Sequence, residues 1–283
     1  YRGNAAGGDL KYTITANVSH YKNEIKKLDG EDKPFYRGRS ERQMMYTAYN
    51  VGTSFPEFYG YKVEGIFQTQ AEADAWPTAF GADGTYNEPG RFKYADINND
   101  GVIDGDDRTW IGSPHPDFTS GLTFDLEYKN WDLTAFFYTS YGNEIMNYVR
   151  RWTDYTNFQG NRSKDRLYKS WGSPYLSNNA DAKLAKAEKL NDKGNQQPSS
   201  HFVEDGSFLR MKNLQIGYSL PDRALQKIGF KRVRLYLQAT NLFTITKYSG
   251  LDPEINAGGV AMGIDRGAWP TPKQILFGVN VGL

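Results

Sequence analysis

Hydrophobic and polar residues alternate along six separate segments of this chain. Between residues 10 and 19, Leu, Tyr, Ile, Ala and Val occupy the even positions, whereas Lys, Thr, Asn and Ser occupy the odd ones. Successive side chains of a β-strand point to opposite faces, so this period of two predicts a strand with one apolar and one polar face. The same pattern predicts further strands at residues 118–128, 131–141, 208–220, 232–240 and 274–283.

One of these segments breaks its own alternation. Within residues 208–220, the apolar Leu214 and Ile216 have even numbers, whereas Leu209 and Met211 have odd ones. One extra residue in a strand moves the side chains beyond it to the opposite face, which is the effect of a β-bulge. We therefore predict a bulge near Lys212 or Asn213.

The lengths of the strands and of their connections point to a membrane. The strands are about 9 to 14 residues long, whereas strands in globular proteins average about 5 to 6 residues and a tilted membrane-crossing strand needs about 9 to 11. The connections Lys129–Asn130 and 221–230 are short, and those at 25–116, 142–206 and 247–271 are long. Short turns on one side and long loops on the other are typical of outer-membrane β-barrels.

The predicted fold class is therefore all-β, with about six long strands of an antiparallel transmembrane β-barrel and long extracellular loops. Aromatic residues near the strand ends (Tyr128, Trp131 and Tyr218) resemble the girdle of such barrels. The predicted lipid-facing residues are Leu122, Phe124, Leu126, Leu133, Phe137, Leu235, Leu237, Phe277 and Val279, and the predicted lumen-facing ones are Asp125, Asp132, Arg234 and Asn280. A soluble sandwich with the apolar face as its core is the alternative.

Composition narrows the functional classes. The 283 residues include 34 Lys and Arg against 33 Asp and Glu, so the net charge gives no electrostatic case for a nucleic-acid partner. The absence of cysteine excludes disulfides, thiolate metal sites and a cysteine nucleophile. Its three histidines lie far apart in the sequence, and no nucleophile elbow or phosphate-binding loop is found. Nothing in the sequence nominates a catalytic site, and we predict that the protein is not an enzyme.

The stretch "DINNDGVIDGDD", residues 96 to 107, has the spacing of a calcium-binding loop. Oxygen ligands at positions 1, 3, 5, 7, 9 and 12, with glycine at position 6, are the pattern of such a loop. The predicted ligands of a structural Ca²⁺ are Asp96, Asn98, Asp100, the carbonyl of Val102, Asp104 and Asp107. Prolines on both sides exclude the helices of an EF-hand, and a solvated turn that binds no ion is the alternative.

Aromatic residues are also frequent in the long predicted loops. Because aromatic faces can stack on sugars or peptide side chains, several of these are candidates for contact with a ligand or a partner protein: Trp76, Trp152, Tyr155, Phe158, Trp171 and Tyr175. Packing within the loops is the alternative for each. Residues 181–190, "DAKLAKAEKL", are predicted to form a short helix.

Five segments of the chain resemble one known family. They are "FYGYKVEGIFQTQAEAD" (58–74), the stretch 94–147 from "YADINNDG" to "YGNEIMN", "SFLRMKNLQIGYSLP" (207–221), "LQATNLFTITKYSGLDPEI" (237–255) and "WPTPKQILFGVNVGL" (269–283). In this order they resemble the carboxy-terminal part of the SusC/RagA family, the TonB-dependent outer-membrane transporters of Bacteroidetes.

The resemblance implies more than the residues show by themselves. It implies a barrel of about 22 strands, of which residues 1–283 form the carboxy-terminal portion, with the plug domain and the TonB box outside this chain. It also implies residence in the bacterial outer membrane, contact with its lipid, energy coupling through TonB, a SusD-like surface lipoprotein as partner, and uptake of oligosaccharides or oligopeptides. A calcium-stabilised surface β domain with an adhesin or binding role is the alternative function. The loops at 25–116 and 142–206 are expected to contact the lipoprotein.

Overall fold

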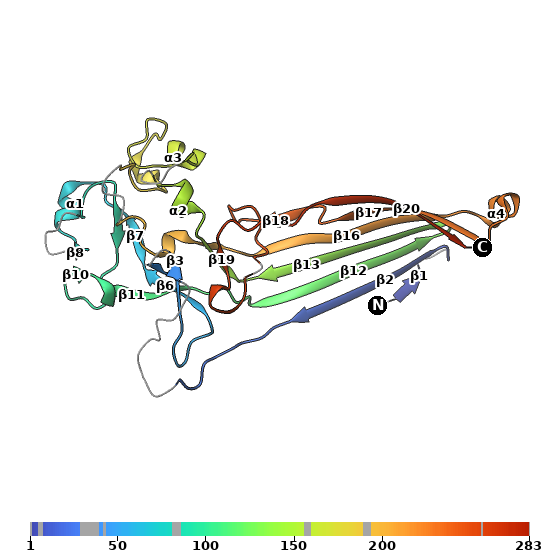
Figure 1. The fold of residues 1–283 in the computed structure, drawn as a ribbon, viewed down its shortest axis with the longest axis horizontal. Helices are drawn as coiled ribbons and strands as arrows, with labels where there is room; N and C mark the ends of the chain where they lie inside the picture. Colours follow the sequence, from blue (N-terminus) through green and yellow to red (C-terminus); the bar gives the residue numbers. More distant parts are fainter. Residues whose placement is uncertain are drawn as a thin grey trace.

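The computed structural model describes residues 2–4, 8–28, 40–41, 44–80, 86–155, 160–188, 194–255 and 257–282. Figure 1 shows a long sheet that forms a shaft and a group of loops, here called the head, at one end of it. Both chain termini lie toward the other end of the shaft, where the helix α4 (Asp222–Ile228) projects. No helix in the described residues is long and apolar enough to span a membrane.

The shaft is one antiparallel sheet in which the predicted strands are confirmed. Its strands follow the order β1-β2-β12-β13-β16-β17-β20, and β18 pairs with β16. Their bounds are β1 (Arg2–Asn4), β2 (Leu10–Ser19), β12 (Phe118–Tyr128), β13 (Trp131–Tyr141), β16 (Phe208–Ser219), β17 (Arg232–Thr240), β18 (Thr244–Thr246) and β20 (Gln274–Gly282). Sequence alternation found every strand of nine or more residues because each has one apolar and one polar face.

The predicted bulge lies in β16. Phe136 of β13 pairs with Asn213, and the next residue, Phe137, pairs with Met211, so Lys212 is the extra residue. Met211 thereby joins the face that carries Leu214 and Ile216, and the alternation broken in the sequence is restored in space.

Register places the apolar side chains of the shaft in rows across the strands. One row runs from Leu126 through Leu133, Ile216 and Leu237 to Phe277. Toward β20 these side chains are exposed, with 50% of Leu237 and 71% of Phe277 accessible. The pairings put all nine predicted lipid-facing residues on this face, and Asp125, Asp132, Arg234 and Asn280 on the other. We call these the apolar and the polar face.

The head contains short strands and helices. Its strands are β3 (Ser40–Glu41), β4 (Met44–Met45), β5 (Thr47–Ala48), β6 (Glu57–Tyr61), β7 (Val63–Ile66), β8 (Thr78–Ala79), β9 (Phe92–Tyr94), β10 (Val102–Ile103), β11 (Arg108–Gly112), β14 (Glu144–Asn147), β15 (Val203–Asp205) and β19 (Ile264–Asp265). Its helices are α1 (Gln70–Asp74), α2 (Arg150–Thr153) and α3 (Lys164–Tyr168), with 3-10 turns η1 (Gly105–Asp107), η2 (Asn179–Asp181), η3 (Ser200–Phe202) and η4 (Gly259–Ala261).

Two apolar cores join the long loops to one another. In the first, Phe58 from the loop at 25–116 packs with Met146 and Phe202 from the loop at 142–206 and with Ile264 from the loop at 247–271. In the second, aromatic residues of β6 and β9 pack with Ala185. The long loops therefore form a common body, and each provides packing for the others.

The helix predicted at residues 181–190 is wrong for the part that the structure describes. Only Asp181 belongs to a helical turn, η2, and the chain from 182 to 188 is non-helical. The guanidinium of Arg166 donates to the carbonyls of Ala185 and Lys186, at 2.7 and 2.9 Å, and the Lys186 amide donates to the Gly90 carbonyl. Tertiary partners for the backbone therefore outweigh the helix propensity of the alanines and lysines. Residues 189 and 190 lie outside the described part.

The two faces lead to a test by substitution. Arginine on the lipid side of a barrel costs about 2–4 kcal/mol at the bilayer midplane, whereas a lumen position tolerates it. Leu214→Arg, on the apolar face of β16 and paired with Ala135 half-way along β13, should therefore lower the free energy of unfolding far more than Gln215→Arg on the polar face of the same strand. Denaturant unfolding of the complete protein in lipid vesicles measures the difference. Equal losses would contradict this assignment of faces.

Candidate functional site

The polar face carries a ladder of side-chain contacts across the strands. Arg234 of β17 pairs with Asp132 of β13, and its Nε lies 2.9 Å from a carboxylate oxygen. The strand between them, β16, has Gly217 at that point, and a Cβ there would lie 2.4 to 2.5 Å from atoms of both partners. Glycine therefore leaves the space through which this ion pair crosses the intervening strand.

A second group of charged side chains lies on β16, near the end of the shaft that meets the head. Arg210 of β16, only 3% exposed, donates to Asp252 at 2.5 Å and to Glu254 at 2.6 Å, and Lys212 at the bulge also contacts Glu254. The two acids belong to the loop at 247–271, which these pairs hold against the sheet. Burial makes removal of one partner costly, because the remaining charge would be left without compensation.

Sequence reasoning missed this group. The sequence shows two basic residues at the bulge, Arg210 and Lys212, and two acids in "LDPE" (251–254). About forty residues separate the two pairs in the chain. Nothing local indicates that they pair.

The aromatic residues predicted to form a girdle lie side by side at the turn end of the shaft. Trp131 and Tyr218 are register partners with ring centroids 4.8 Å apart, and Tyr128 pairs with Trp131 on the other side. At the head end, Phe118 and Tyr141 stack at 5.3 Å. The apolar face of the shaft is thus bordered by aromatic rings at both ends, as in barrels whose rings lie at the two membrane interfaces.

Most of the loop aromatics proposed for ligand contact pack inside the head. Tyr155 is 1% exposed and its hydroxyl donates to the carbonyl of Asn195, so its ring packs inside the head, which was the alternative for this residue. Trp76 and Trp171 are half-buried and donate to the Tyr94 carbonyl and to Gln68. Trp152 packs on the first core.

Tyr175 has a different environment from these four side chains. It is 62% exposed and its ring touches that of Tyr168, which is 50% exposed. Phe158 lies outside the described residues. Contact with a partner or ligand stays a prediction for the exposed part of this set.

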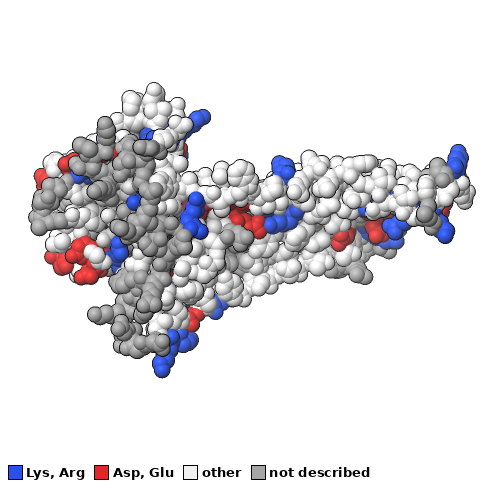
Figure 2. Space-filling model, in the orientation of Figure 1, with Lys and Arg blue, Asp and Glu red and all other residues white. Residues whose placement is uncertain are grey.

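The predicted calcium loop adopts a tight turn at the far end of the head. Asp96 accepts from the amides of Asn99 and Gly101, and Gly101 has a φ of 85°. Asn98 and Asp100 each accept an amide two residues further on, as does Asp104. Figure 2 shows acidic side chains gathered at this end of the molecule. In the described part of the chain, no three Asp, Glu, His or Cys side chains converge as ligands of a metal ion.

Asp107 and Val102 have additional structural roles. The Asp107 carboxylate is fully buried and accepts from the amides of Ile97 at 2.7 Å and Asp104 at 2.8 Å, so it ties the two ends of the loop together. Val102 lies in β10, which pairs with β8. The loop is thus closed by its own hydrogen bonds, and occupancy by Ca²⁺ stays a prediction.

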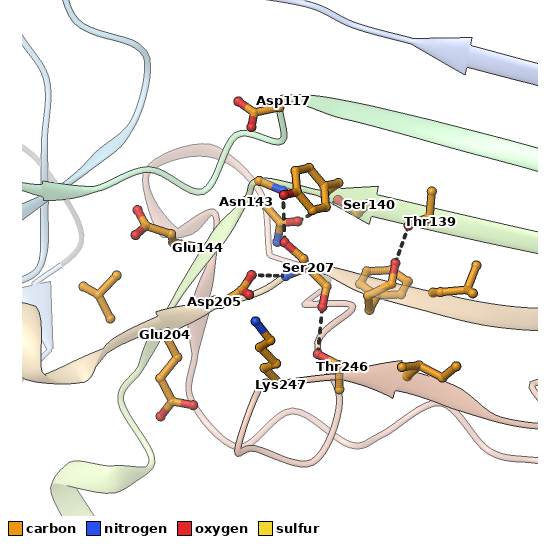
Figure 3. A pocket seen from close by; sticks show the side chains of 16 residues that line it. Asp117, Thr139, Ser140, Asn143, Glu144, Glu204, Asp205, Ser207, Thr246 and Lys247 are labelled. Carbon is orange, nitrogen blue, oxygen red and sulfur yellow. Dashed lines mark hydrogen bonds between the residues drawn. The ribbon is translucent and has the colours of Figure 1, made fainter. Parts of the chain in front are cut away.

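A cavity of about 630 Å³ lies where β13, β15, β16 and β18 meet the head. Figure 3 shows its polar lining, with the Lys247 amine directed toward Asp205 and Ser207. Hydrogen bonds from Ser207 keep the pKa of Asp205 below its usual range, with a further contribution from the charge of Lys247, whereas burial raises the pKa of Glu144.

No family model matches the chain. Individual known proteins do match it, and those described here are TonB-dependent receptors and a peptide transporter. Over 98% of its length it is 33% identical to TonB-dependent receptor P3 of Formosa agariphila, and it covers 27% of that protein. It is 30% identical over 96% of its length to TonB-dependent receptor SusC of Bacteroides thetaiotaomicron. The solved structure of the RagAB peptide transporter superposes with a TM-score of 0.72 at 25% identity, over 99% of this chain and 28% of that one.

The chain belongs to the SusC/RagA family.

Membership in the SusC/RagA family confirms the resemblance seen in the sequence, the β-barrel fold class and the location in the bacterial outer membrane. The apolar face of the shaft is therefore its lipid-facing side, and the polar face lines the barrel interior. This SusC/RagA chain spans about a quarter of the length of the curated relatives that it matches.

Protonation of His201 in the head of this SusC/RagA chain leads to a pH-dependence prediction. Burial, and then the charge of Arg150, lower the pKa of His201 well below 6.5, and its Nε2 accepts from Arg150 at 3.1 Å. In the folded head the His201 ring is neutral, whereas in the unfolded chain it takes up a proton below about pH 6.5. The free energy of unfolding of the head should therefore be at its full value above about pH 6.5 and should fall as the pH decreases below it. Hydrogen exchange of residues 142–206 between pH 5 and pH 8 measures this.

The glutamine variant separates titration from packing. His201→Gln keeps a polar side chain but cannot titrate, so it should flatten the acid response, whereas His20→Gln at an exposed site should not. An unchanged response in His201→Gln would assign the acid sensitivity to other groups.

Proposed function

We propose that this chain forms part of an outer-membrane transporter that takes up oligosaccharides or oligopeptides. The observation that carries the proposal is the combination of a lipid-facing sheet with a charged and hydrogen-bonded interior face and a packed head at one end. Such an arrangement lets polar cargo pass beside the ladder formed by Asp132, Arg234 and their neighbours, while lipid contacts the apolar face. The relatives reported above carry the names of receptors and a transporter, which favours a non-enzymatic role.

The alternative of a soluble adhesin-like domain is less consistent with the exposed apolar surface. Ile275 and Phe277 are 67% and 71% exposed on the apolar face of β20, and Val281 is 53% exposed. A soluble sandwich would cover such residues with a second sheet. Lipid covers them in an outer-membrane protein.

The exposed side chains of the head and the open edges of the sheet both point to partners of the proposed transporter. We propose that a SusD-like lipoprotein contacts the head, where Leu167, Tyr168 and Tyr175 expose 47%, 50% and 62% of their surface. The open edges of the sheet require further strands, because unpaired backbone groups cannot remain in lipid. Protein outside these residues is proposed to close a barrel of about 22 strands, to hold the plug and to contact TonB.

Uptake by intact cells tests the proposed function. Cells that carry the complete protein should accumulate labelled oligopeptides or oligosaccharides, and collapse of the proton-motive force should abolish that uptake. Comparison of the two labelled pools identifies the cargo class. Uptake that equals that of cells lacking the protein, for both pools, would contradict the proposal.

Crosslinking in the same cells places the partner. A lipoprotein over the mouth should crosslink to cysteines introduced at Tyr168 or Tyr175, whereas cysteines introduced at Lys129 or Lys227, at the opposite end of the shaft, serve as matched controls. Crosslinks to the controls alone would reverse the assigned topology.

We also propose that Ca²⁺ binds the loop at residues 96–107. All the side chains concerned offer oxygen, the donor that Ca²⁺ prefers, and Asp96, Asn98, Asp100 and Asp104 are close together in sequence. They would hold the ion with the Val102 carbonyl. Asp107 was also predicted as a ligand, but both of its carboxylate oxygens accept backbone amides, so we propose that it stabilises the loop and does not bind the ion. Bound Ca²⁺ would add a crosslink at the far end of the head.

Two aspartates give different expected responses to Ca²⁺. In Asp100→Asn, thermal unfolding of the head should lose its dependence on Ca²⁺ but match the wild type in EDTA. In Asp107→Asn, stability should fall by about 1–3 kcal/mol even in EDTA, because a buried acceptor of two amides is altered. A wild-type protein whose unfolding temperature is the same in Ca²⁺ and in EDTA would rule out the calcium site.

A further inference from the structure

A second cavity of the head, of about 370 Å³, lies between the loop at 142–206 and the loop at 247–271. Its walls come from the end of β14, from α2, from the start of α3 and from β19. In Figure 1, β19 lies where the head adjoins the shaft. Among the described residues, it shares none with the lining of the cavity of Figure 3. Its volume is within the range of about 300–1,000 Å³ that is usual for small-ligand sites.

Asn147 borders this second cavity with a buried carboxamide that is only partly hydrogen-bonded. The side chain is 2% exposed, and its Nδ2 donates to Glu204 at 3.1 Å and to Ser249 at 3.3 Å. Because a carboxylate only accepts, the contact with Glu204 identifies this end of the amide as the nitrogen. The Oδ1 has no hydrogen-bond partner among the residues that the structure describes. A buried acceptor without a donor is unfavourable, so a ligand that brings an N–H or O–H group to it would be favoured.

Asp265 lies beside Asn147 and places a carboxylate in the same wall. The two residues are register partners in the parallel pair of β14 and β19, so their side chains leave the same face. Asp265 is 4% exposed and accepts from the Tyr248 hydroxyl at 2.6 Å and from the Gly267 amide at 2.8 Å. Burial, and then the hydrogen bond to Asp265, raise the pKa of Tyr248 above its usual range, so the tyrosine keeps its proton and remains the donor.

The charges around the second cavity do not balance. Arg150 pairs with Asp154 at 3.0 Å and with Glu204 at 3.3 Å, and within the described part of the chain no basic side chain forms a salt bridge with Asp265. Lys164 also lines the cavity, but it is exposed to solvent, where its charge is screened. Buried negative charge without compensation is unfavourable, so the cavity favours a ligand that carries a positive charge.

A primary ammonium group matches both features of the wall. It combines a positive charge with three N–H donors, which suits an unpartnered amide oxygen beside a carboxylate. Sugar hydroxyls could donate to Asn147, but they would leave the charge of Asp265 uncompensated. In addition, the described residues that line the cavity include no aromatic ring on which a sugar could stack. The chemistry of the wall therefore favours a peptide over an oligosaccharide.

We propose that this cavity binds a primary ammonium group of an oligopeptide cargo. The ammonium donates to the Asn147 Oδ1 and to the Asp265 carboxylate, and the rest of the peptide leaves the cavity past Lys164. The group can come from the amino terminus of the peptide or from a lysine side chain, since both present the same donors and charge. This inference rests on the proposed transport function and narrows its cargo to peptides.

Calorimetric titration of the purified complete transporter tests the site. The probes are tetraalanine amide, which has a terminal amine, N-acetyl-trialanyl-lysine amide, which has only a side-chain amine, and N-acetyl-tetraalanine amide, which has none. At least one amine-bearing peptide should bind roughly tenfold more tightly than the amine-free one, and the tighter of the two identifies the source of the ammonium. Equal affinities for all three peptides overturn the site. Peptide uptake by cells that persists beside that result would leave the transport function standing.

Two variants have opposite expected effects on binding of the amine-bearing peptide. Asp265→Asn removes the buried charge and should weaken binding roughly tenfold, whereas the control Asp205→Asn, in the cavity of Figure 3, should leave it unchanged. Lys164→Glu replaces a repelling cation at an exposed position, so it should tighten binding about threefold at low salt. Should Asp265→Asn fail to fold, Lys164→Glu decides, and unchanged or weaker binding in that variant overturns the site.

Discussion

Backbone hydrogen bonding in a medium without water is the constraint on which the shaft depends. Every amide and carbonyl within the hydrocarbon must find a protein partner, and a sheet provides these partners through regular ladders between long strands. The ladder fixes the register, and the register fixes which side chains share a row. The apolar rows and the ion pair that crosses over Gly217 both follow from the same pairing.

The head obeys a different rule, since it is made of connections and not of long strands. Its segments are short, and several of its polar residues are buried, including Arg91, which donates to Glu188 at 2.7 and 2.9 Å. Packing of apolar side chains from three loops, most of them aromatic, supplies the burial that no single loop could reach by itself. The shaft is thus specified locally, strand by strand, and the head only by long-range contacts.

That difference explains what the sequence could predict. The long strands and the bulge at Lys212 were predictable because alternation is a local property read along one segment. The pairing of Arg210 with Asp252 was not, because the partners come from different loops. Residues 182–188 look helical by composition, yet Arg166 and Gly90 take their backbone groups into tertiary hydrogen bonds. Tyr155 was a candidate for contact with a ligand or partner, and its position in the first core was not predictable because that core is assembled from several loops.

The shared cores of the head bear on how its sequence can vary. Phe58, Met146, Phe202 and Ile264 come from three loops and fill one space. A larger side chain in any one of them displaces residues of the other two, so a tolerated change in one loop requires compensating changes in its neighbours. The three loops should therefore diversify together during evolution, and a single loop transplanted from a relative should fit poorly without the other two.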